Sequence, residues 1–370
     1  MLRGPEIPDY VRGMMVYVPG KPIEEVRREL GIKDEIIKLA SNENPLGPSP
    51  LALEAMRRAL PELHRYPDGG GFYLRKAIAE RFKLGMERVI LGNGSTDIIE
   101  MIARAHLADG DEAVFSQQSF VMYPIAVASV NGRGVAVPAT ADRRHDLDAM
   151  AAAIGPKTKL VYIANPSNPT GTYVTRTEMD RFLDRIPENV LVAVDEAYHE
   201  YVEPGDYPDC LDDVRAGRNV IVLRTFSKIY GLAGIRAGYA FASEETIANL
   251  NQIRSPFNIS HLAQVAGLAA LEDEPWAARC RAQNIAELAF LHAELGRRKI
   301  AHTPSVANFI LIEPGRDIQP LFLDLQKRGV IIRPMGGPGL ANCARVTVGT
   351  RAENIRLLQA LDDLLAADRK

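Results

Sequence analysis

Several short runs in the middle of the chain are apolar at every position. The clearest are VLVAV at residues 190–194 and VIVL at residues 220–223. A strand that is apolar throughout must be covered on both faces, which is typical of a parallel sheet packed between layers of helices. β-rich runs alternate with helix-like segments at residues 88–93, 111–116, 133–139, 159–166, 189–198, 219–227 and 238–243. The pattern predicts an α/β fold with a mostly parallel seven-stranded sheet flanked by helices, and functional groups at the strand ends.

The pattern changes from about residue 266 onward. Helix-like stretches at 266–298 and 353–370 surround two short strand-like runs, NFILIE at 308–313 and ARVTVG at 344–349. Because chains longer than roughly 250 to 300 residues usually divide into domains, this change predicts a second, smaller α+β domain. We expect an N-terminal arm and part of the small domain over residues 1–40, a large domain over 41–265, and the rest of the small domain over 266–370.

Composition and charge argue against several classes of function. The 370 residues carry a net charge of -3, with an isoelectric point near 6.2, which does not favour nucleic acid or an anionic membrane as a partner. No apolar run approaches the roughly 20 residues that cross a bilayer, and residues 1–13 do not read as a signal peptide. The widely spaced Cys210, Cys280 and Cys343 predict reduced structural thiols and no metal site. We expect a cytoplasmic protein that acts on small molecules.

Lys228 lies between a strand-like run and the glycine-punctuated stretch 231–240. Polar groups at nearby strand ends, each explicable alone as a turn or helix cap, are Asn168, Asp195, Tyr198, Gly94, Ser95 and Thr96. Together they match the needs of pyridoxal phosphate. The pyridine nitrogen needs a carboxylate, the phosphate suits a helix N-terminus with hydroxyls and an arginine, and the aldehyde needs a lysine.

An ordered series of sequence blocks resembles one family over nearly the whole chain. The blocks include KLASNENPLGPSP at 38–50, RYPDGGGFYLRKAIA at 65–79, LGNGSTDIIE at 91–100, ANPSNPTG at 164–171, VDEAYHEY at 194–201 and RTFSKIYGLAGIRAGYA at 224–240. The chain resembles the histidinol-phosphate aminotransferases, pyridoxal-phosphate enzymes of fold type I. The resemblance implies amino transfer between L-histidinol phosphate and 2-oxoglutarate, in histidine biosynthesis. It also implies a homodimer in which each site is completed by the neighbouring subunit.

The resemblance also implies roles for individual residues around the cofactor. Lys228 would form the imine with the aldehyde, and Asp195 would pair with the pyridine nitrogen. Asn168 and Tyr198 would hold the phenolic oxygen of the ring. The phosphate would lie among Gly94, Ser95, Thr96, Thr225, Ser227 and Arg236, with Tyr66 reaching it from the partner subunit. Arginine suits this position because its fork matches a pair of phosphate oxygens.

One position departs from part of the family. In FSQQSFVMYP at 115–124, the residue expected on the face of the cofactor ring is Phe120, where some relatives have tyrosine. Stacking survives this change, but a phenolic hydrogen bond is lost. Tyr123, three residues later, is interpreted as a packing residue.

Substrate recognition is expected to depend on two arginines near the C-terminus. Arg333 in VIIRPM and Arg345 in ARVTVG match the anion-binding positions of the family, with Asn168 beside them and Tyr17 closing over the substrate. An aromatic amino acid aminotransferase for phenylalanine or tyrosine is the main alternative, since an imidazole-sized slot is easily shared. A decarboxylase of phosphorylated threonine and a non-catalytic regulator on the same fold remain further alternatives. Arg333 separates the first two, because a carboxylate needs mainly one arginine and a phosphate profits from two.

Overall fold

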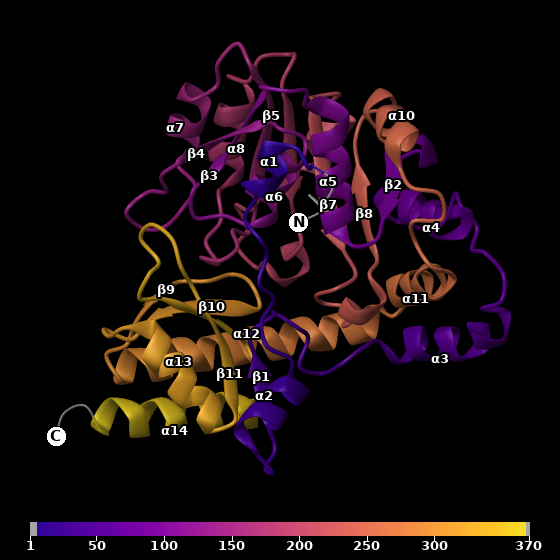
Figure 1. Cartoon of the computed structure of the whole chain (residues 1–370). Coiled ribbons are helices and arrows are strands. Elements are labelled where there is room, and N and C mark those ends of the chain that lie inside the picture. The colour runs from indigo at the N-terminus through magenta and orange to yellow at the C-terminus, as the bar shows by residue number, and fades with distance from the viewer. Residues whose placement is uncertain (1–5, 368–370) are drawn as a thin grey trace.

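The computed structural model describes residues 6–367 and contains two β-sheets (Figure 1). The larger has seven strands in the order β2-β8-β7-β6-β5-β3-β4. Their bounds are β2 Val89–Gly92, β3 Glu112–Ser116, β4 Arg133–Val137, β5 Thr158–Ala164, β6 Leu191–Asp195, β7 Val220–Thr225 and β8 Gly238–Phe241. Only β8 runs against its neighbours, so the predicted mostly parallel seven-stranded sheet is confirmed.

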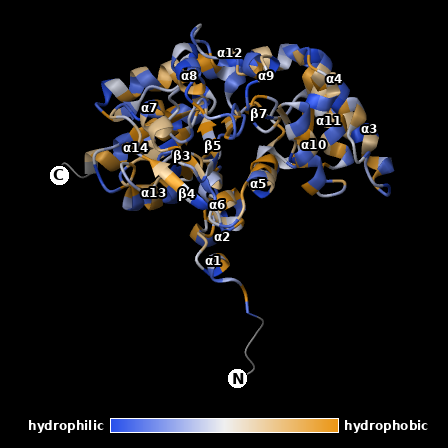
Figure 2. Cartoon of the chain, turned by 90° about the horizontal axis from the view of Figure 1, so that it is seen from above, coloured by the Kyte–Doolittle hydropathy of each residue, from blue (hydrophilic) through white to orange (hydrophobic). Residues whose placement is uncertain are grey.

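Both faces of the large sheet are covered by apolar cores, as the uninterrupted apolar runs predicted. In β6, Val192 and Val194 point into one core, while Leu191 and Ala193 point into the other. The same alternation holds along β7. The covering helices are α3 Pro50–Ala59, α4 Phe72–Phe82, α5 Ser95–His106, α6 Met122–Ser129, α7 Leu147–Ala152, α8 Arg176–Leu183, α9 Leu211–Arg215, α10 Glu244–Ile253 and α11 His261–Glu272. Figure 2 shows apolar colours on the central strands and polar colours on the outer surfaces of these helices.

The second sheet has five strands in the order β1-β11-β12-β10-β9. Their bounds are β1 Ile37–Leu39, β9 Ala301–Thr303, β10 Phe309–Glu313, β11 Val330–Pro334 and β12 Ala344–Thr347. It packs with α12 Glu274–Arg297, α13 Ile318–Lys327 and α14 Arg351–Ala367 around one apolar core, which includes Leu291, Ile310 and Leu325. Because β1 pairs in parallel with β11, the N-terminal part of the chain belongs to this smaller sheet. The predicted boundaries at 40/41 and 265/266 stay predictions.

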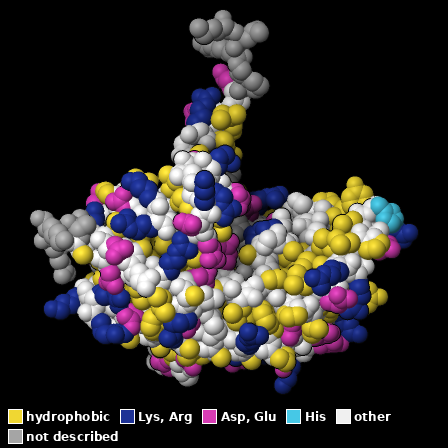
Figure 3. Space-filling view, turned by 90° about the horizontal axis from the view of Figure 1, so that it is seen from below, with side chains coloured by type: hydrophobic (Ala, Val, Ile, Leu, Met, Phe, Trp, Pro, Cys, Tyr) yellow, Lys and Arg dark blue, Asp and Glu magenta, His cyan; other side chains and the backbone are white. Residues whose placement is uncertain are grey.

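The remaining elements are short. Two helices, α1 Asp9–Arg12 and α2 Ile23–Leu30, precede β1, and the segment that carries α1 projects from the body of the molecule (Figures 2 and 3). Single 3-10 turns occur at η1 Leu60–Glu62, η2 Met86–Arg88, η3 His199–Tyr201 and η4 Ala233–Ile235.

Many helix starts are fixed by local side chains, but the start of α5, which matters for the site, is not. Thr175 and Glu178 form a reciprocal capping box at α8, and the hydroxyl of Ser260 accepts from the backbone amide of Ala263 at α11. At α5 the preceding residue is Gly94, with φ of 78°, and no side chain caps the helix. The first amides of α5 are therefore left for another acceptor.

Candidate active site

A cavity of about 760 Å³ lies between the large sheet and the small one. On one side it is lined by the last residues of four parallel strands, Ser116, Ala164, Asp195 and Thr225 of β3, β5, β6 and β7. On the other side β11 and β12 contribute to its wall. Cavities outside the carboxyl ends of parallel strands are where α/β proteins commonly bind ligands. Among the predicted site residues, those that line it are Tyr17, Ser95, Thr96, Phe120, Asn168, Asp195, Tyr198, Thr225, Ser227, Lys228, Arg236, Arg333 and Arg345.

Lys228 follows β7 and directs its amine into the cavity. Its Nζ donates to the backbone oxygen of Ser41 at 3.3 Å and lies 5.5 Å from the centre of the Tyr198 ring. Burial first, and then the positive charges of Arg345 and Arg236, lower the pKa of Lys228 from 10.5 to about 8, against the opposing charges of Glu43 and Asp195. A substantial fraction of this amine is therefore neutral near physiological pH.

Asp195 ends β6 and is buried. Its Oδ1 accepts from the backbone amide of Ala197 at 3.1 Å, and its Oδ2 accepts from the hydroxyl of Tyr123, also at 3.1 Å. Burial raises the pKa of Asp195 to about 6, against the opposing effects of the Tyr123 hydrogen bond, the Ala197 amide and the charge of Lys228. The carboxyl is thus ionised through most of the neutral range. Tyr123, interpreted from sequence as a packing residue, contacts the site directly through its hydroxyl.

Tyr198, Asn168 and Arg345 form a continuous hydrogen-bonded chain. Arg345 Nη1 donates to Asn168 Oδ1 at 2.6 Å, and Asn168 Nδ2 donates to the Tyr198 hydroxyl at 3.4 Å. Asn42, just after β1, donates its Nδ2 to the same hydroxyl at 2.9 Å. Burial raises the pKa of Tyr198, and both Arg345 and the Asn42 bond oppose that rise. The chain fixes the Tyr198 hydroxyl between the two sheets.

The start of α5 and the side chain of Arg236 form a cup of hydrogen-bond donors. Ser95 and Thr96 are its first two residues, and the guanidinium of Arg236 lies beside Gly94, where an added Cβ would come within 2.3 Å of Arg236 Nη2. Arg236 Nη1 also contacts Ser227 Oγ at 3.4 Å. Free backbone amides, a helix dipole and a guanidinium together favour a phosphate at this position.

Thr225 supports the shape of the cup through hydrogen bonds to the backbone. Its hydroxyl donates to the backbone oxygen of Ala237 at 3.2 Å and accepts from the amide of Ser227 at 3.1 Å. The proton of the Thr225 hydroxyl is therefore already used in a hydrogen bond. The Thr225 side chain holds the turn that carries Ser227.

Arg333 and Arg345 are directly opposed across the antiparallel strands β11 and β12. Opposed residues in such a ladder place their side chains on the same face. Arg333 Nη2 donates to the backbone oxygen of Val18 at 2.9 Å, and its guanidinium lies 5.8 Å from the centre of the Tyr17 ring. Burial lowers the pKa of Arg345, and the neighbouring charge of Arg333 adds to that effect. Two cations that repel each other in one cavity wall create a strong preference for an anion between them.

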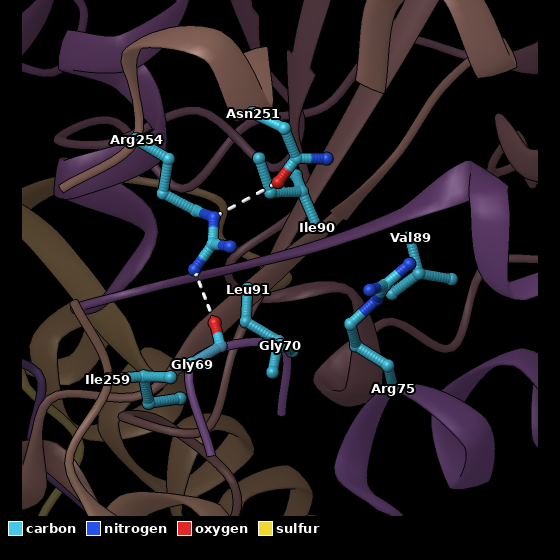
Figure 4. Close-up of a pocket in the computed structure, with 9 residues that line it drawn as sticks. All are labelled: Gly69, Gly70, Arg75, Val89, Ile90, Leu91, Asn251, Arg254 and Ile259. Atoms are coloured by element: carbon cyan, nitrogen blue, oxygen red, sulfur yellow. Dashed lines mark hydrogen bonds between the residues drawn. The ribbon is translucent and has the colours of Figure 1, made fainter. Parts of the chain in front are cut away.

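Tyr66 is the predicted site residue that lies away from this cavity. Its side chain is 83% exposed and stacks on Phe257, with ring centroids 4.7 Å apart. Nearby, Arg254 donates to the backbone oxygen of Gly69 at 2.7 Å in the wall of a second cavity, which has a volume of only about 10 Å³ (Figure 4). These contacts anchor the loop that carries Tyr66 while leaving its ring free to contact another chain.

Comparison with known proteins places this architecture in a family. The sequence profile described as "Aminotransferase class I and II" matches residues 34–361. The chain is 47% identical over 363 residues to the histidinol-phosphate aminotransferase of Moorella thermoacetica. The matched residues cover 98% of this chain and 94% of that protein. The chain belongs to the histidinol-phosphate aminotransferase family. It is also 48% identical to histidinol-phosphate aminotransferase 2 of Pseudomonas aeruginosa, over 97% of each chain.

The fold of this aminotransferase is likewise shared with a solved structure. The crystal structure of histidinol-phosphate aminotransferase from Sinorhizobium meliloti in complex with pyridoxal-5'-phosphate superposes with a TM-score of 0.91 at 28% identity, and covers 99% of both chains. The predicted fold class and the prediction of an aminotransferase are confirmed. The roles assigned to single residues stay predictions.

Sequence reasoning missed several polar residues of the aminotransferase cavity, among them Tyr123, Asn42 and Gln118. Tyr123 contacts Asp195, Asn42 contacts Tyr198, and Gln118 donates its Nε2 to the backbone oxygen of Pro338 at 3.3 Å. Gln118 thereby ties the turn after β3 to the glycine-rich loop at 335–343. The only sequence signal was position: Asn42 lies in a block that carries the resemblance, and Tyr123 is one helical turn beyond Phe120.

The structure also bears on metal sites, membrane-spanning helices and disulfides. Within residues 6–367, no group of three or more histidine, cysteine, aspartate or glutamate side chains is arranged to hold a metal ion. No helix in the same part of the chain has the length and apolar character needed to cross a membrane. The three cysteines are buried and none is in a disulfide.

Proposed function

We propose that this aminotransferase binds pyridoxal phosphate and transfers the amino group of L-histidinol phosphate to 2-oxoglutarate, as a step of histidine biosynthesis. The observation that carries the proposal is the opposed pair of Arg333 and Arg345 in the same cavity as Lys228 and Asp195. The names of the similar chains, which are histidinol-phosphate aminotransferases, support the same substrate. A cytoplasmic location stays a prediction.

The side chains in the cavity fit pyridoxal phosphate. The cup at the start of α5, with Ser95, Thr96 and Arg236, would hold the phosphate. The hydroxyl of Tyr198, with the Nδ2 group of Asn168, would hold the phenolic oxygen of the ring. When bound, the cofactor supplies an electron sink that stabilises negative charge on the substrate carbon.

Phe120 would supply a flat apolar face for the cofactor ring. It lines the cavity and packs edge-on against Tyr123, with ring centroids 5.8 Å apart. An aromatic face suits a pyridine ring without needing a hydroxyl. The absence of a hydroxyl at this position therefore leaves the ring to be oriented by Asp195 and Tyr198.

Lys228 would act first as the cofactor anchor and then as the proton carrier. In the second role its Nζ would take and return the proton of the substrate carbon that bears nitrogen. A general base must be neutral at the working pH, and burial together with Arg345 and Arg236 lowers the pKa of Lys228 to about 8. The arginines that would bind anions in this cavity thus also lower the pKa of the base, Lys228.

The arginine pair would solve the problem of two different substrates. Histidinol phosphate carries a phosphate where glutamate carries its α-carboxylate, so one anion site must accept both. Arg345 is fixed by bonds to Asn168 and to the backbone oxygen of Ala40 at 2.9 Å. Arg333 adds a second fork, which a phosphate with three acceptor oxygens can use. Tyr17, beside Arg333, would close over the substrate.

A homodimer with shared sites is supported by exposed apolar surface near Tyr66. Leu60, Leu63, Phe72 and Tyr73 are each at least half exposed in the same part of the chain. Figure 3 shows hydrophobic side chains gathered on this side of the molecule. Exposed apolar patches of this kind are typical of protein interfaces. We propose that a second copy covers this surface and that Tyr66 reaches the phosphate cup of that copy.

The test of the substrate is a steady-state comparison of amino donors to 2-oxoglutarate. Histidinol phosphate, phenylalanine, tyrosine and histidine are compared by kcat/KM in the purified holoenzyme. Histidinol phosphate is expected to rank first. A wild type that prefers phenylalanine or tyrosine would instead make the chain an aromatic amino acid aminotransferase.

A further inference from the structure

Tyr123 is one of the most deeply buried aromatic residues among those the structure describes, and it lies on α6, in the wall of the cavity. Its hydroxyl donates to Asp195 Oδ2 at 3.1 Å, while the amide of Ala197 donates to Oδ1 of the same carboxylate. A carboxylate offers about four acceptor positions on its two oxygens. The two protein donors therefore hold the carboxylate in one orientation and still leave lone pairs for a further donor in the cavity.

Packing gives the Tyr123 hydroxyl a single position. The ring stacks on Tyr162, with centroids 4.7 Å apart and planes 2° from parallel, and Phe120 packs against its edge. Tyr162 is in turn fixed by donating its hydroxyl to the backbone oxygen of Ile99 at 3.0 Å. Burial first, and then the nearby charge of Asp195, raise the pKa of Tyr123 well above its ordinary value. Tyr123 thus remains a donor throughout the working pH range.

The groups around Asp195 push its protonation in opposite directions. Burial and the charge of Glu196 favour the neutral acid, and the Tyr123 bond, the Ala197 amide and the charge of Lys228 favour the anion. The charge of Glu196 is itself paired with Arg224, at 2.8 Å. After burial, the Tyr123 bond has the largest effect. Without that bond the balance moves toward a neutral carboxyl.

We propose that Tyr123 is a positioning residue that keeps the Asp195 carboxylate ionised and correctly oriented in the active site. This inference rests on the proposed function at one point, the pairing of the ionised Asp195 with the pyridine nitrogen of the cofactor. The proposal also explains where the hydroxyl that Phe120 lacks has a counterpart. The hydroxyl that is absent from the ring face is present one helical turn later, where it acts on the carboxylate instead.

The first test uses the protein without cofactor, so it does not depend on catalysis. The Asp195 carboxyl is titrated by 13C NMR, with Asp195→Asn used to assign its resonance. In Tyr123→Phe, which removes only the hydroxyl, the proton affinity of the carboxylate is expected to rise about ten-fold or more. Tyr162→Phe is the matched control, because it removes the other hydroxyl of the stacked pair and leaves Asp195 untouched. An unchanged Asp195 in Tyr123→Phe, or an equal rise in Tyr162→Phe, would overturn the proposal.

A second measurement needs no variant. In the wild type, the buried hydroxyl proton of Tyr123 is expected to shift in the 1H spectrum as Asp195 titrates near pH 6. A Tyr123 proton that does not respond to this titration contradicts the proposal, even if a variant fails to fold.

The holoenzyme supplies the last readout. In Tyr123→Phe the acidic limb of the kcat/KM profile is expected to move to higher pH, with activity partly recovered in alkaline buffer. A uniform loss at every pH would indicate a merely structural role and would count against the proposal. Failure of the proposed function looks different, because the apo-protein would still show the Asp195 change while no cofactor-loaded enzyme forms.

Discussion

Arg333 and Arg345 occupy opposed positions on β11 and β12, so two guanidinium groups lie on one face at the same level of the small sheet. Their contacts differ. Arg345 is bonded to Asn168 inside the site, whereas Arg333 is bonded to the backbone of Val18, in the N-terminal segment that crosses the cavity mouth. The pair thus combines one guanidinium that is held inside the site with one that is held by the N-terminal segment lining the cavity. This difference predicts different roles for the two residues in substrate choice.

Arg333→Ala is expected to reduce the use of histidinol phosphate more than the use of phenylalanine. A phosphate near neutral pH carries more charge than a carboxylate and offers three acceptor oxygens, so it loses more when one arginine is removed. Since charge-assisted hydrogen bonds contribute roughly 1.5 to 3 kcal/mol, kcat/KM for histidinol phosphate should fall about ten- to a hundred-fold. Arg345→Ala, the control, should impair both donors. Equal losses for the two donors in Arg333→Ala would remove Arg333 from phosphate recognition.

Lys228 makes a prediction about stability as a function of pH in the protein without cofactor. Its pKa is about 8 in the folded chain, against 10.5 ordinarily. Between these pH values the unfolded chain binds more protons at this residue than the folded chain does. The contribution of Lys228 to the free energy of unfolding therefore increases as the pH rises. Below pH 8 both states are protonated and the folded chain bears the full cost of a buried charge. Lys228→Met should therefore be more stable than the wild type below pH 8, with the advantage shrinking toward pH 10.5.

Chemical denaturation of both proteins at several pH values measures this difference. Lys76→Met, at an exposed position on α4, serves as the control and should differ from the wild type by a constant amount. An advantage of Lys228→Met that does not change with pH would show that the folded-state pKa of Lys228 is not lowered.

Much of the large sheet could be predicted because its signal is local. Runs such as residues 190–194 and 220–223 are apolar at each position, and the two cores that bury alternate residues of β6 and β7 explain why. The seven predicted runs correspond to the seven strands. Membership of β1 in the small sheet depends on pairing with β11, almost 300 residues later. Sequence reasoning placed part of residues 1–40 in the small domain but did not predict this pairing.

Sequence reasoning pointed to cavity residues with a distinctive chemical requirement and did not point to those that act through a neighbour. Lys228 and Asp195 are hard to explain as packing, so their types already indicate chemistry. Tyr123 and Asn42 are ordinary residue types for a core and a turn, and only the distances of 3.1 Å and 2.9 Å to Asp195 and Tyr198 distinguish them. Such contacts depend on side-chain orientation across elements, which no spacing along the chain reveals.

Asp195→Asn tests the need for charge beside the cofactor nitrogen. The substitution keeps the size of the side chain and lets it accept from Ala197, but it removes the negative charge. We expect kcat to fall by several powers of ten, with about 1.4 kcal/mol of barrier behind each factor of ten. Folding should be retained, which circular dichroism checks. A variant with near-normal kcat would contradict the role of Asp195 in stabilising charge on the ring.

Tyr66 allows the shared-site homodimer to be tested by mixing two inactive proteins. Lys228→Ala removes the amine of a site, and Tyr66→Ala removes the exposed ring that we propose serves the site of the other subunit. If sites are shared across a two-fold axis, a mixed dimer holds one site that lacks both groups and one site that has both. Random exchange of subunits in equal amounts should then restore about a quarter of the wild-type activity.

The control distinguishes sharing from simple exchange. Mixing Lys228→Ala with Asp195→Asn, two changes in the same chain's cavity, leaves every site of a mixed dimer with one defect and should restore nothing. Sedimentation of the mixtures checks that dimers form in both cases. Recovery in the control, or no recovery with Tyr66→Ala although mixed dimers are present, would place Tyr66 outside the partner's active site. Because the Tyr66 ring stacks on Phe257 and Arg254 helps to hold its loop, Arg254→Ala in the Tyr66-donating subunit should lower the recovered activity.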